Sequence, residues 1–484
     1  MAHKNSLLNA GDFNLDQVEI ISYRNYAEEG GPMTMDIAPI TIQVELLEDI
    51  TQPFLTGAVT VYDTQDVRTV LPLTGLERLI LKFNTPGMPG YAFNEDEGVP
   101  FQIYKIEKVK IDDGHSRGQY YKIHFTSLEA YFNDVTRVSQ AFEGVIEDAI
   151  DTLLRQKNYL NSKKPLFFEP TKSNTKNVIP NLKPVDTIAF LSGQARSSLY
   201  ANTGYMFYET AQGFHFRSIE SMLAMGGSVA RPARWSFSYG IQNLGKDKVE
   251  EGMNSVKRYE LHNPIDMEYT INEGSYASRL VTIDHFNKKI DTTDFDYSES
   301  FKNHFHLEHR DGEKTDDQMI LPLHKFADTG KDLSQMPMSK LMVMSETAQK
   351  HNDYEDIPQK ELIQQQISQT SLLNQNNVLL LVNGNTMLRA GDIINFNMPL
   401  MRPVLDGKQE YNPYQGGRYL LRSIKHTISM TEGKHDMVLH CMKDSVRTPY
   451  PIETNEVQIV SPDRSTASTI YDEDNKTLSN IELT

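Results

Sequence analysis

A run of histidines with a glutamate is the first candidate for chemistry. His304, His306, Glu308 and His309 lie within the seven residues NHFHLEH. If this segment is a strand, His304, His306 and Glu308 project on one side and the apolar residues between them on the other. Two imidazoles and a carboxylate can bind a metal ion. The same alternation is typical of a half-exposed strand, and no His-Glu-x-x-His helix or second ligand cluster supports a metal, so we predict no metal site.

The other motifs that could carry chemistry are incomplete. Asp284-His285 with a serine or threonine could belong to a nucleophilic triad, but the sequence has no Gly-x-Ser-x-Gly elbow. Gly226-Gly227-Ser228 lacks the Gly-Lys-Ser/Thr ending of a phosphate loop. Asp112-Asp113-Gly114 resembles half of a calcium loop, and Glu147-Asp148 is expected to be solvating charge on the polar face of a helix. We therefore predict no catalytic, cofactor-binding or metal-ligating residues, no cofactor and no enzymatic activity.

Composition narrows the class of protein. The chain has 484 residues, a net charge of -17 and one cysteine, Cys441, and its length suits about three domains. One cysteine excludes an intrachain disulfide and a cysteine zinc cluster, and Cys441 is expected to be a small apolar residue on a strand. The negative charge argues against binding nucleic acid through its phosphates, but it suits a wall that nucleic acid slides past.

Targeting signals are missing from the sequence. No apolar run approaches about 18 residues, and Met1–Asn14 has no apolar core like that of a signal peptide. We therefore predict no membrane insertion, and we expect the protein to be made and folded in a cytoplasm.

The most regular segment that could position side chains is residues 384–444. GNTMLRAGDIINFNMP predicts a strand at Met387 and Leu388, a turn at Ala390-Gly391-Asp392 and a second strand from Ile393. RYLLRSIKHTISM and HDMVLHCM predict two strands of a hairpin joined by TEGK. In the first of these strands one face is expected to carry Leu420, Arg422, Ile424, His426 and Ile428.

Residues 40–126 have the same design. TIQVEL and GAVTVY alternate apolar and polar residues, and ERLILKF is strand-like after a break at residues 63–73. FQIYKIEKVK and QYYKIHF flank Asp112-Asp113-Gly114, which is a strong hairpin signal. Residues 83–101, rich in Gly, Pro and Asn, are expected to form a long loop. We therefore predict two related β-barrels in one chain, alike in pattern rather than in residue identity.

Between and after these segments the periodicity changes. An amphipathic helix is predicted from Phe142, Val145, Ile146, Ala149, Ile150, Leu153 and Leu154. A second helix is expected to begin near Pro184, followed by a hairpin of YMFYE and FHFRS. Residues 340–349 and 359–373 are also predicted to be helical, and the weakly amphipathic second helix should be stabilised by an intersubunit or interdomain contact.

The predicted fold class is α+β, mainly β. The expected parts are an N-terminal arm or edge strand (1–39), a first β-barrel (40–126), an α+β subdomain (127–230), a second β-barrel (231–265 and 377–445), a partly helical insertion (266–376) and an acidic C-terminal tail (446–484). The tail is expected either to stay mobile or to lie on a neighbour, and the second is favoured.

The order of these segments resembles the central baseplate hub protein of contractile-tailed bacteriophages, which is related to the hub part of type VI secretion spike proteins. Three stretches carry the resemblance. The first is VTVYDTQDVRTVLPLTGLERLILKF with IYKIEKVKIDDG and YYKIHFTSLEAYFND, and the second is FEGVIEDAIDTLL with NVIPNLKPVDTIAFLSGQARS and YMFYETAQGFHFRSI. The third is VNGNTMLRAGDIINF with GGRYLLRSIKHTISM and HDMVLHCMKD.

This resemblance implies a structural protein of the virion tail baseplate, assembled in the host cytoplasm. It implies two tube-protein-like β-barrels per chain and a homotrimer that forms a pseudo-sixfold ring, adapts a threefold spike to a sixfold tail tube, and lines the DNA passage. The implied partners are a spike or tail-lysozyme trimer on one face, tail tube or tube-initiator proteins on the other, and wedge proteins. Glu45, Glu107 and Asp392 are candidates for an acidic lumen.

Two alternatives stay open. The first is the hub of a type VI or bacteriocin-like contractile injection machine, in which a spike often continues the same chain. The second, from another class, is a tail-associated cell-wall hydrolase, for which the sequence offers no glycosidase or peptidase motif. Clearing of peptidoglycan in a zymogram would support the hydrolase.

Overall fold

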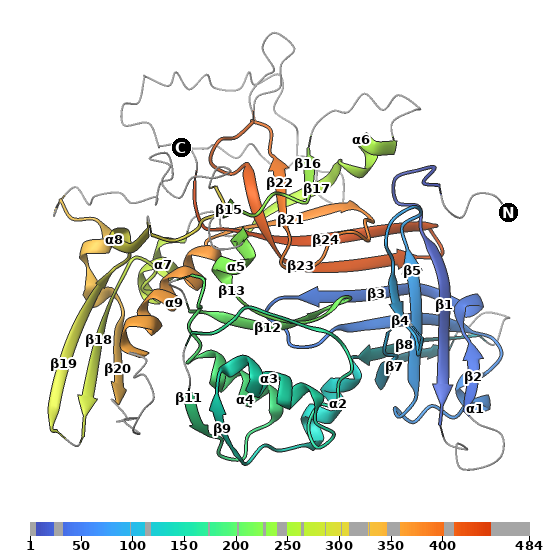
Figure 1. Cartoon of the computed structure of the whole chain (residues 1–484). Helices are drawn as coiled ribbons and strands as arrows, with labels where there is room; N and C mark the ends of the chain where they lie inside the picture. The colour runs from blue at the N-terminus through green and yellow to red at the C-terminus, as the bar shows by residue number, and fades with distance from the viewer. Residues whose placement is uncertain are drawn as a thin grey trace, which may run out of the picture. The chain divides into compact units, whose positions relative to one another are not determined.

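The computed structural model describes residues 6–23, 32–96, 98–111, 118–172, 175–200, 203–225, 229–239, 249–262, 266–285, 287–301, 303–308, 328, 330–345, 359–400 and 411–446. All of these residues belong to one compact unit, residues 1–448. The fold is α+β and mainly β, as the sequence predicted (Figure 1). No helix within the described ranges has the length and apolar character needed to cross a bilayer.

One sheet of 14 strands contains both regions that were predicted to be barrels. Its main path runs β17-β21-β24-β23-β3-β4-β8-β7-β5-β1-β2, and β6, β16 and β22 pair beside this path. The N-terminal strands are β1 (Asn14–Ser22), β2 (Met33–Asp36), β3 (Thr41–Asp49), β4 (Thr56–Asp63), β5 (Arg78–Asn84), β6 (Tyr91–Phe93), β7 (Phe101–Ile111) and β8 (Gln119–Thr126). The C-terminal strands are β16 (Trp235–Ser238), β17 (Val256–His262), β21 (Asn376–Asn383), β22 (Ile393–Asn397), β23 (Gly417–Ser429) and β24 (Lys434–Lys443).

The two regions meet at a direct strand pair. β3 and β23 are antiparallel neighbours over seven residue pairs, from Ser423 opposite Asp49 to Ser429 opposite Gln43. Figure 1 shows β3 and β4 beside β23 and β24, although the two pairs come from opposite parts of the chain. The sheet is therefore continuous from one region into the other.

Two apolar clusters lie against this sheet, one for each region. The first core includes Val44 and Leu46 of β3, which alternate with polar residues as expected for a strand with one buried face. The second core includes Leu380 of β21 and Leu439 of β24. Each region thus has an apolar interior of its own and a shared outer face.

The first core extends beyond the predicted boundaries. Val18 and Ile20 of β1 are fully buried in it, so part of the segment predicted as an arm or edge strand supplies a strand of the sheet. Tyr91 and Phe93 of β6 are buried in it as well, inside the predicted loop 83–101. The break at residues 63–73 contains a short helix, α1 (Val67–Val70). Asp112-Asp113-Gly114 lies outside the described residues, but β7 and β8 pair as its hairpin signal predicts.

A separate α+β layer with its own core follows β8. Its elements are α2 (Leu128–Val135), β9 (Ala141–Gly144), α3 (Ile146–Arg155), β10 (Leu166–Phe168), β11 (Thr175–Val178), α4 (Pro184–Ser192), β12 (Tyr205–Thr210), β13 (Gly213–Ser218), α5 (Ile219–Leu223), β14 (Ala224–Met225) and β15 (Val229–Ala230). The predicted helix at Pro184 and the predicted hairpin of β12 and β13 are confirmed. The first predicted helix begins later than expected, because Phe142 lies on β9 and pairs with β11.

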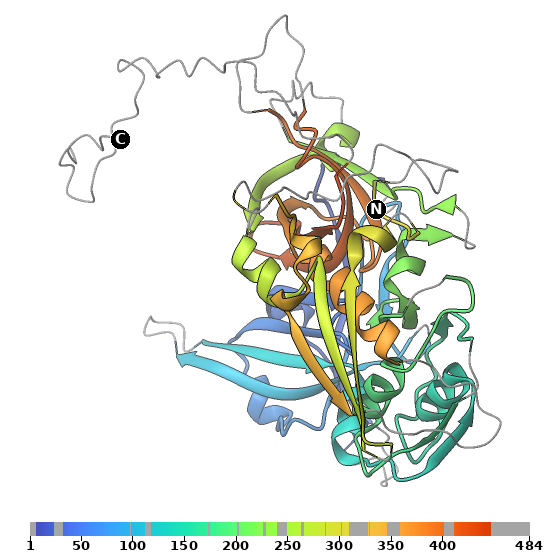
Figure 2. The ribbon, with the colours of Figure 1, turned by 90° about the vertical axis from the view of Figure 1, so that its left-hand side faces the viewer.

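The predicted insertion contains a second small sheet with helices (Figure 2). Its elements are α7 (Met267–Glu273), β18 (Ala277–Asp284), β19 (Lys289–Asp296), α8 (Tyr297–Phe301), two short 3-10 turns, η2 (Leu333–Gln335) and η3 (Pro337–Ser339), β20 (Leu341–Ser345) and α9 (Gln359–Leu373). A short helix, α6 (Val249–Met253), precedes β17 in the second barrel region. The helix predicted at residues 359–373 is confirmed, and Gln364 Nε2 of α9 donates to the β18 carbonyl of Ser278 (3.0 Å). The helix predicted at residues 340–349 is wrong, because residues 341–345 pair in parallel with β18.

Two details of the C-terminal strands also differ from the prediction. Met387 and Leu388 form no strand, and the chain turns through residues 384–392 before β22 begins. On β23 a bulge between Leu421 and Ser423 shifts the alternation by one residue. As a result Leu421 and Ile424 lie in the same core, whereas Leu420 packs on a different cluster.

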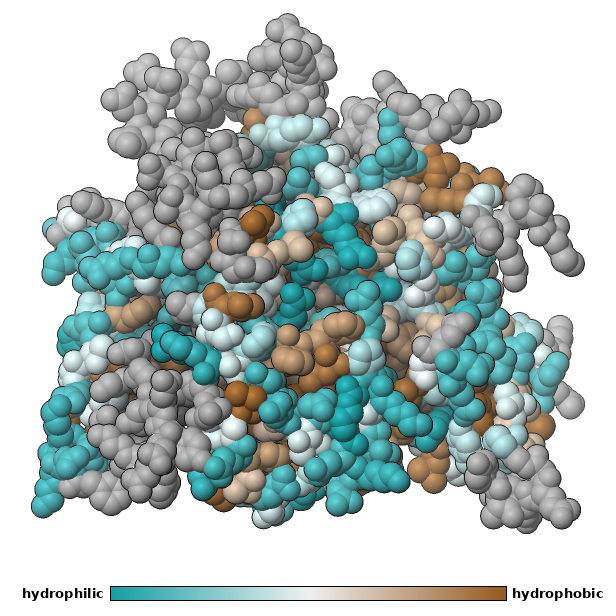
Figure 3. Space-filling view, viewed as in Figure 1, coloured by the Kyte–Doolittle hydropathy of each residue, from teal (hydrophilic) through white to brown (hydrophobic). Residues whose placement is uncertain are grey.

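The surface that Figure 3 shows is mixed. Among the coloured residues on this face, hydrophobic side chains gather in small groups between hydrophilic ones.

Candidate assembly surface

Six charged or titratable side chains cross the outer face of the sheet, on the side opposite the first core. This charged strip consists of Lys425 on β23, Glu45 on β3, Lys122 and His124 on β8, and Glu107 and Lys105 on β7. Lys425 Nζ and Lys122 Nζ lie 2.8 Å and 2.7 Å from the two carboxylate oxygens of Glu45. His124 Nε2 lies 2.8 Å from Glu107 Oε1, and Lys105 pairs with the other oxygen. Ion pairs therefore cross the boundary between the two regions.

The carboxylates of the strip are held ionised by their partners. Burial opposes the ionisation of Glu45, but hydrogen bonds from Lys122 and Lys425 outweigh it and lower its pKa. Lys105, followed by His124, lowers the pKa of Glu107 to about 2. Ion pairs that are open to solvent contribute little to the free energy of folding. The strip therefore specifies the register of strands more than it stabilises the fold.

Beneath the boundary lies a buried hydrogen-bonded chain of three rings. Tyr91 Oη lies 2.9 Å from His426 Nε2, and His426 Nδ1 lies 3.0 Å from His435 Nε2. Tyr91 comes from β6 of the N-terminal region, and the two histidines come from β23 and β24. The Arg389 guanidinium lies over the Tyr91 ring, 4.2 Å from its centroid, in a cation–π contact. Side chains of both regions thus share one buried polar network.

Burial keeps the two histidines of this chain neutral. The pKa of His426 is well below its ordinary value because of burial, with further contributions from His435 and Arg389. Burial likewise lowers the pKa of His435 to about 4. In neutral histidines one ring nitrogen donates and the other accepts, which allows the chain of hydrogen bonds from one histidine to the other.

Glu48 links the same boundary to the α+β layer. Its carboxylate accepts the backbone N–H groups of Ala211, in the turn between β12 and β13 (3.0 Å), and of Ala390, before β22 (3.1 Å). Burial raises the pKa of Glu48 against the opposing charge of Arg389. One side chain of β3 therefore holds three parts of the chain together.

The histidine segment of the sequence analysis forms no strand, and its side chains have separate partners. His304 Nε2 lies 3.0 Å from Gln365 Nε2, His306 Nδ1 lies 2.8 Å from Asp444 Oδ2, and Glu308 pairs with Lys443 at 2.7 Å. His309 lies outside the described residues. No group of three or more His, Cys, Asp or Glu side chains in the described ranges is placed to hold a metal ion.

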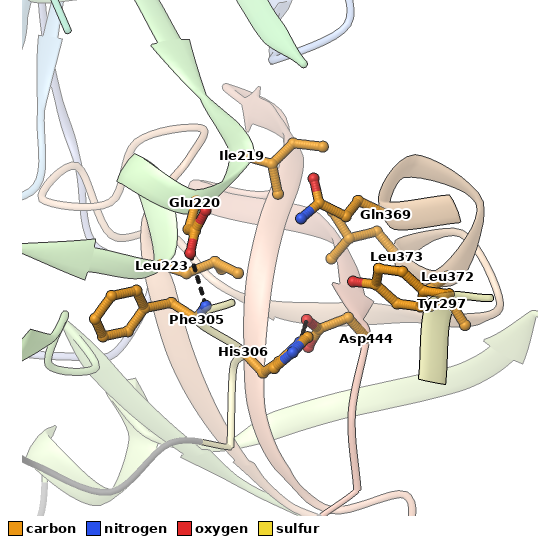
Figure 4. A pocket seen from close by; sticks show the side chains of 10 residues that line it. All are labelled: Ile219, Glu220, Leu223, Tyr297, Phe305, His306, Gln369, Leu372, Leu373 and Asp444. Carbon is orange, nitrogen blue, oxygen red and sulfur yellow. Dashed lines mark hydrogen bonds and ion pairs between the residues drawn. The ribbon is translucent and has the colours of Figure 1, made fainter. Parts of the chain in front are cut away.

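Figure 4 shows the small cavity beside this segment. Glu220, His306 and Asp444 line it together with the apolar side chains of Leu372 and Leu373, and its volume is about 10 Å³. That volume holds about one water molecule. Burial opposes the ionisation of Asp444, but His306 and the hydrogen bonds that Asp444 accepts lower its pKa. Through these contacts the segment joins the insertion to the end of β24.

The remaining sequence candidates also have structural roles where the structure describes them. Asp284 accepts hydrogen bonds from the backbone and side chain of Asn287 in the turn after β18. Cys441 is buried in the second core, where burial raises its pKa. Gly226-Gly227-Ser228 lies outside the described residues.

The prediction for Glu147 is wrong. Its side chain is buried and accepts the backbone N–H and the hydroxyl of Thr171, whereas Asp148 beside it is exposed. An acidic residue in a first helical turn can face inward when a neighbouring segment offers donors, and the sequence pattern does not reveal such donors.

The candidates for an acidic lumen have different surroundings. Asp392 is buried and accepts from Arg231 Nη2 (2.9 Å) and from the backbone N–H of Arg389 (3.0 Å), so it lines no channel. Glu45 and Glu107 are partly exposed on the outer face, but each is paired with a lysine. The strip is therefore a surface of alternating charge rather than an acidic one.

Sequence reasoning missed Tyr91, His435, Glu48 and Arg389. The contacts of Tyr91, Glu48 and Arg389 join residues about 300 positions apart, such as Tyr91 with His426, and only His435 has its partner nearby in the chain, at His426. The one available signal was His426, a polar residue at an inward position of an alternating strand.

Several solved structures align with most of this chain. The tail protein from Neisseria meningitidis MC58 aligns with a TM-score of 0.48 and 9% identity over 90% of this chain and 97% of that chain. The prophage MuSo2 43 kDa tail protein from Shewanella oneidensis aligns with a TM-score of 0.48 and 8% identity over 90% and 100%. The E. coli c3393 protein aligns with a TM-score of 0.39 and 7% identity over 85% and 75%; it is described as a component of the type VI secretion system with structural similarity to the T4 bacteriophage tail proteins gp27 and gp5.

The structural neighbours are phage tail and type VI secretion proteins. No protein-family model and no curated protein sequence matches the chain. Likeness at these identities concerns the fold and assigns no function by itself.

Proposed function

We propose that this protein is a non-enzymatic structural hub of a phage tail baseplate. Three copies form a closed ring with pseudo-sixfold symmetry, which adapts a threefold spike on one face to a sixfold tail tube on the other. The charged strip faces the lumen, through which DNA passes without being bound. In this proposal the protein is located in the virion tail after assembly in the host cytoplasm.

A repeated strand order carries the proposal. β3, β4, β5, β7 and β8 follow one another in the chain, and in the sheet they are ordered β3-β4-β8-β7-β5. β17, β21, β22, β23 and β24 follow in the same chain order and are ordered β17-β21-β24-β23-β22. All of these neighbours are antiparallel in both sets. The same module thus occurs twice, with the second copy displaced along the sheet rather than reflected.

Strand register supports the repeat residue by residue. Side by side on β3, β4 and β8 lie Val44, Val59 and Ile123, and the corresponding row on β17, β21 and β24 is Tyr259, Leu380 and Leu439. Extending these rows makes Glu45 equivalent to Glu260, Leu46 to Leu261 and His124 to His440. Residue identity between the modules is low, but the pairing pattern is the same.

Bulges fall at equivalent positions in both modules. The register shifts between Thr41 and Gln43 on β3 and between Val256 and Arg258 on β17. It also shifts between Ile103 and Lys105 on β7 and between Leu421 and Ser423 on β23. β7 has one further shift, between Glu107 and Lys110, that β23 lacks. Because a bulge bends a strand at a defined place, the two shared bulges bend both modules at equivalent positions.

A trimer follows from two modules per chain. Three chains supply six near-equivalent modules, and a closed ring gives each sheet edge a partner, which removes the aggregation risk of an open edge. No catalytic constellation among the described residues competes with this role.

Electron microscopy of the purified full-length protein tests the proposal. We expect end-on class averages with threefold symmetry, six similar lobes and an open centre. Class averages of single compact particles, or of twofold dimers, would contradict it.

A further inference from the structure

Two strand edges have no partner among the described residues. β7 pairs with β5 only at Phe101 and Gln102, and beyond them its free side has no neighbouring strand in the described ranges. β17 pairs with β21 on one side. In the repeat, β7 is equivalent to β23 and β17 to β3, and β23 pairs with β3 inside the chain. The internal β3–β23 boundary is therefore a template for the boundary between copies.

The template fixes which residues would meet. Lys425 is opposite Leu47 at the internal boundary, and Thr427 is opposite Glu45. Val438 and Lys122 are equivalent, because each directly precedes one of the equivalent residues Leu439 and Ile123. Lys425 pairs with Val438 and Glu107 pairs with Lys122, so Lys425 and Glu107 are equivalent as well. Leu47 follows Leu46, and His262 follows Leu261. Because those two leucines are equivalent, Leu47 and His262 are equivalent too.

A second pair follows in the same way. Thr427 pairs with Asp436 on β24, and Lys110 pairs with Tyr120 on β8. Asp436 and Tyr120 each lie four residues before an equivalent histidine, so Lys110 corresponds to Thr427. Glu45 corresponds to Glu260, as the register of β3 and β17 gives.

From this register we infer that β7 of one copy pairs antiparallel with β17 of the next, with Lys110 opposite Glu260 and Glu107 opposite His262. This inference rests on the proposed ring and names its contact. Both predicted pairs join opposite or compatible charges, although charge played no part in deriving them. Lys110 and Glu260 are exposed in the single chain, and so is His262. The charged strip then continues from one copy into the next.

A charge swap tests the contact. Glu260→Lys and Lys110→Glu each place like charges opposite one another, which is unfavourable across paired strands. We expect each single variant to raise the concentration at half-assembly by about tenfold, and the double variant Lys110→Glu/Glu260→Lys to restore it largely. The matched controls Lys289→Glu on β19 and Glu268→Lys on α7, both exposed, should leave assembly unchanged. Sedimentation over a concentration series of the wild type and the five variants measures these differences.

Disulfide trapping tests the β7–β17 contact independently of charge. Directly opposite residues on antiparallel strands have Cα atoms about 4.5–5.5 Å apart, within disulfide range. The variant Lys110→Cys/Glu260→Cys should therefore give covalent dimers and trimers on non-reducing gels after mild oxidation, and neither single cysteine variant should do so. The native Cys441 is buried and should not react.

The outcomes separate this inference from the proposed function. A wild-type trimer in which the swap and the cysteine pair behave like the controls would overturn the β7–β17 contact and leave the ring standing. A wild-type monomer would overturn both.

Discussion

The buried histidines at the module boundary are the residues most sensitive to pH. Burial lowers the pKa of His435 to about 4 and holds that of His426 well below its ordinary value. In the unfolded chain both titrate near the ordinary value of about 6.5. Between these two pKa values the unfolded state binds more protons than the folded state. The contribution of the histidines to the free energy of unfolding is therefore fully present above about pH 6.5 and is lost as the pH falls toward 4.

We expect His435→Gln to remove part of this dependence. Each proton taken up only by the unfolded chain changes the free energy of unfolding by about 1.4 kcal/mol per pH unit. Urea unfolding from pH 7.5 to 4 should give a shallower fall for His435→Gln than for the wild type. His285→Gln, at an exposed histidine, is the control and should keep the wild-type slope. Parallel curves for all three proteins would contradict the neutral histidine chain.

Glu147 and Asp148 allow burial to be separated from helix-end electrostatics. Both lie in the first turn of α3, where a negative charge is favourable. Only Glu147 is buried against Thr171. We expect Glu147→Ala to lower the free energy of unfolding by about 2–3 kcal/mol, since it leaves two buried donors without an acceptor. Asp148→Ala should cost about 0.5 kcal/mol, and equal losses in urea unfolding would show that the Thr171 contact contributes nothing.

At the scale of elements, alternation and turn residues were enough to predict most strands. They were not enough where tertiary contacts determine the secondary structure. Residues 341–345 have helix-forming leucine and methionine, yet parallel pairing with β18 makes them a strand. The sequence pattern does not indicate the bulge on β23. The partners of Glu48 and Tyr91 are remote in the chain, so the pattern does not indicate them either. The candidate site was therefore predictable only as an exposed strand face with Glu45 and Glu107.

The turn before β22 is the element whose backbone is most constrained. Gly391 has a φ of +86°, and a Cβ there would lie 2.7 Å from Tyr208 Oη in a buried site. Gly433, in the β23–β24 turn, has a φ of +64°, and a methyl group on its Cα would point into open space. We expect Gly433→Ala to cost about 1 kcal/mol from backbone strain alone. Gly391→Ala should cost about 2–4 kcal/mol because overpacking adds to that strain, and similar thermal shifts for both variants would contradict the close contact with Tyr208.

In the whole molecule, one chain carries two modules with the same strand order, and eight of their strands lie side by side as β17-β21-β24-β23-β3-β4-β8-β7. Among the described residues, β17 and most of β7 have no strand partner on their outer sides. The internal β3–β23 boundary has ion pairs on its outer face and the Tyr91–His426–His435 chain beneath. The boundary between copies repeats the strand pairing without that buried network, so we expect it to be the weaker of the two. The ring should therefore dissociate into folded chains before those chains unfold.

The mass of the full-length protein in solution, determined by sedimentation equilibrium at moderate salt, distinguishes a threefold ring from a single chain or a dimer. A chain of 55.2 kDa that closes into a ring of three gives about 165 kDa. A species of about 165 kDa that neither grows nor splits over a tenfold change in concentration is the predicted result. A stable mass of 55.2 kDa, or of about 110 kDa, would contradict the threefold ring.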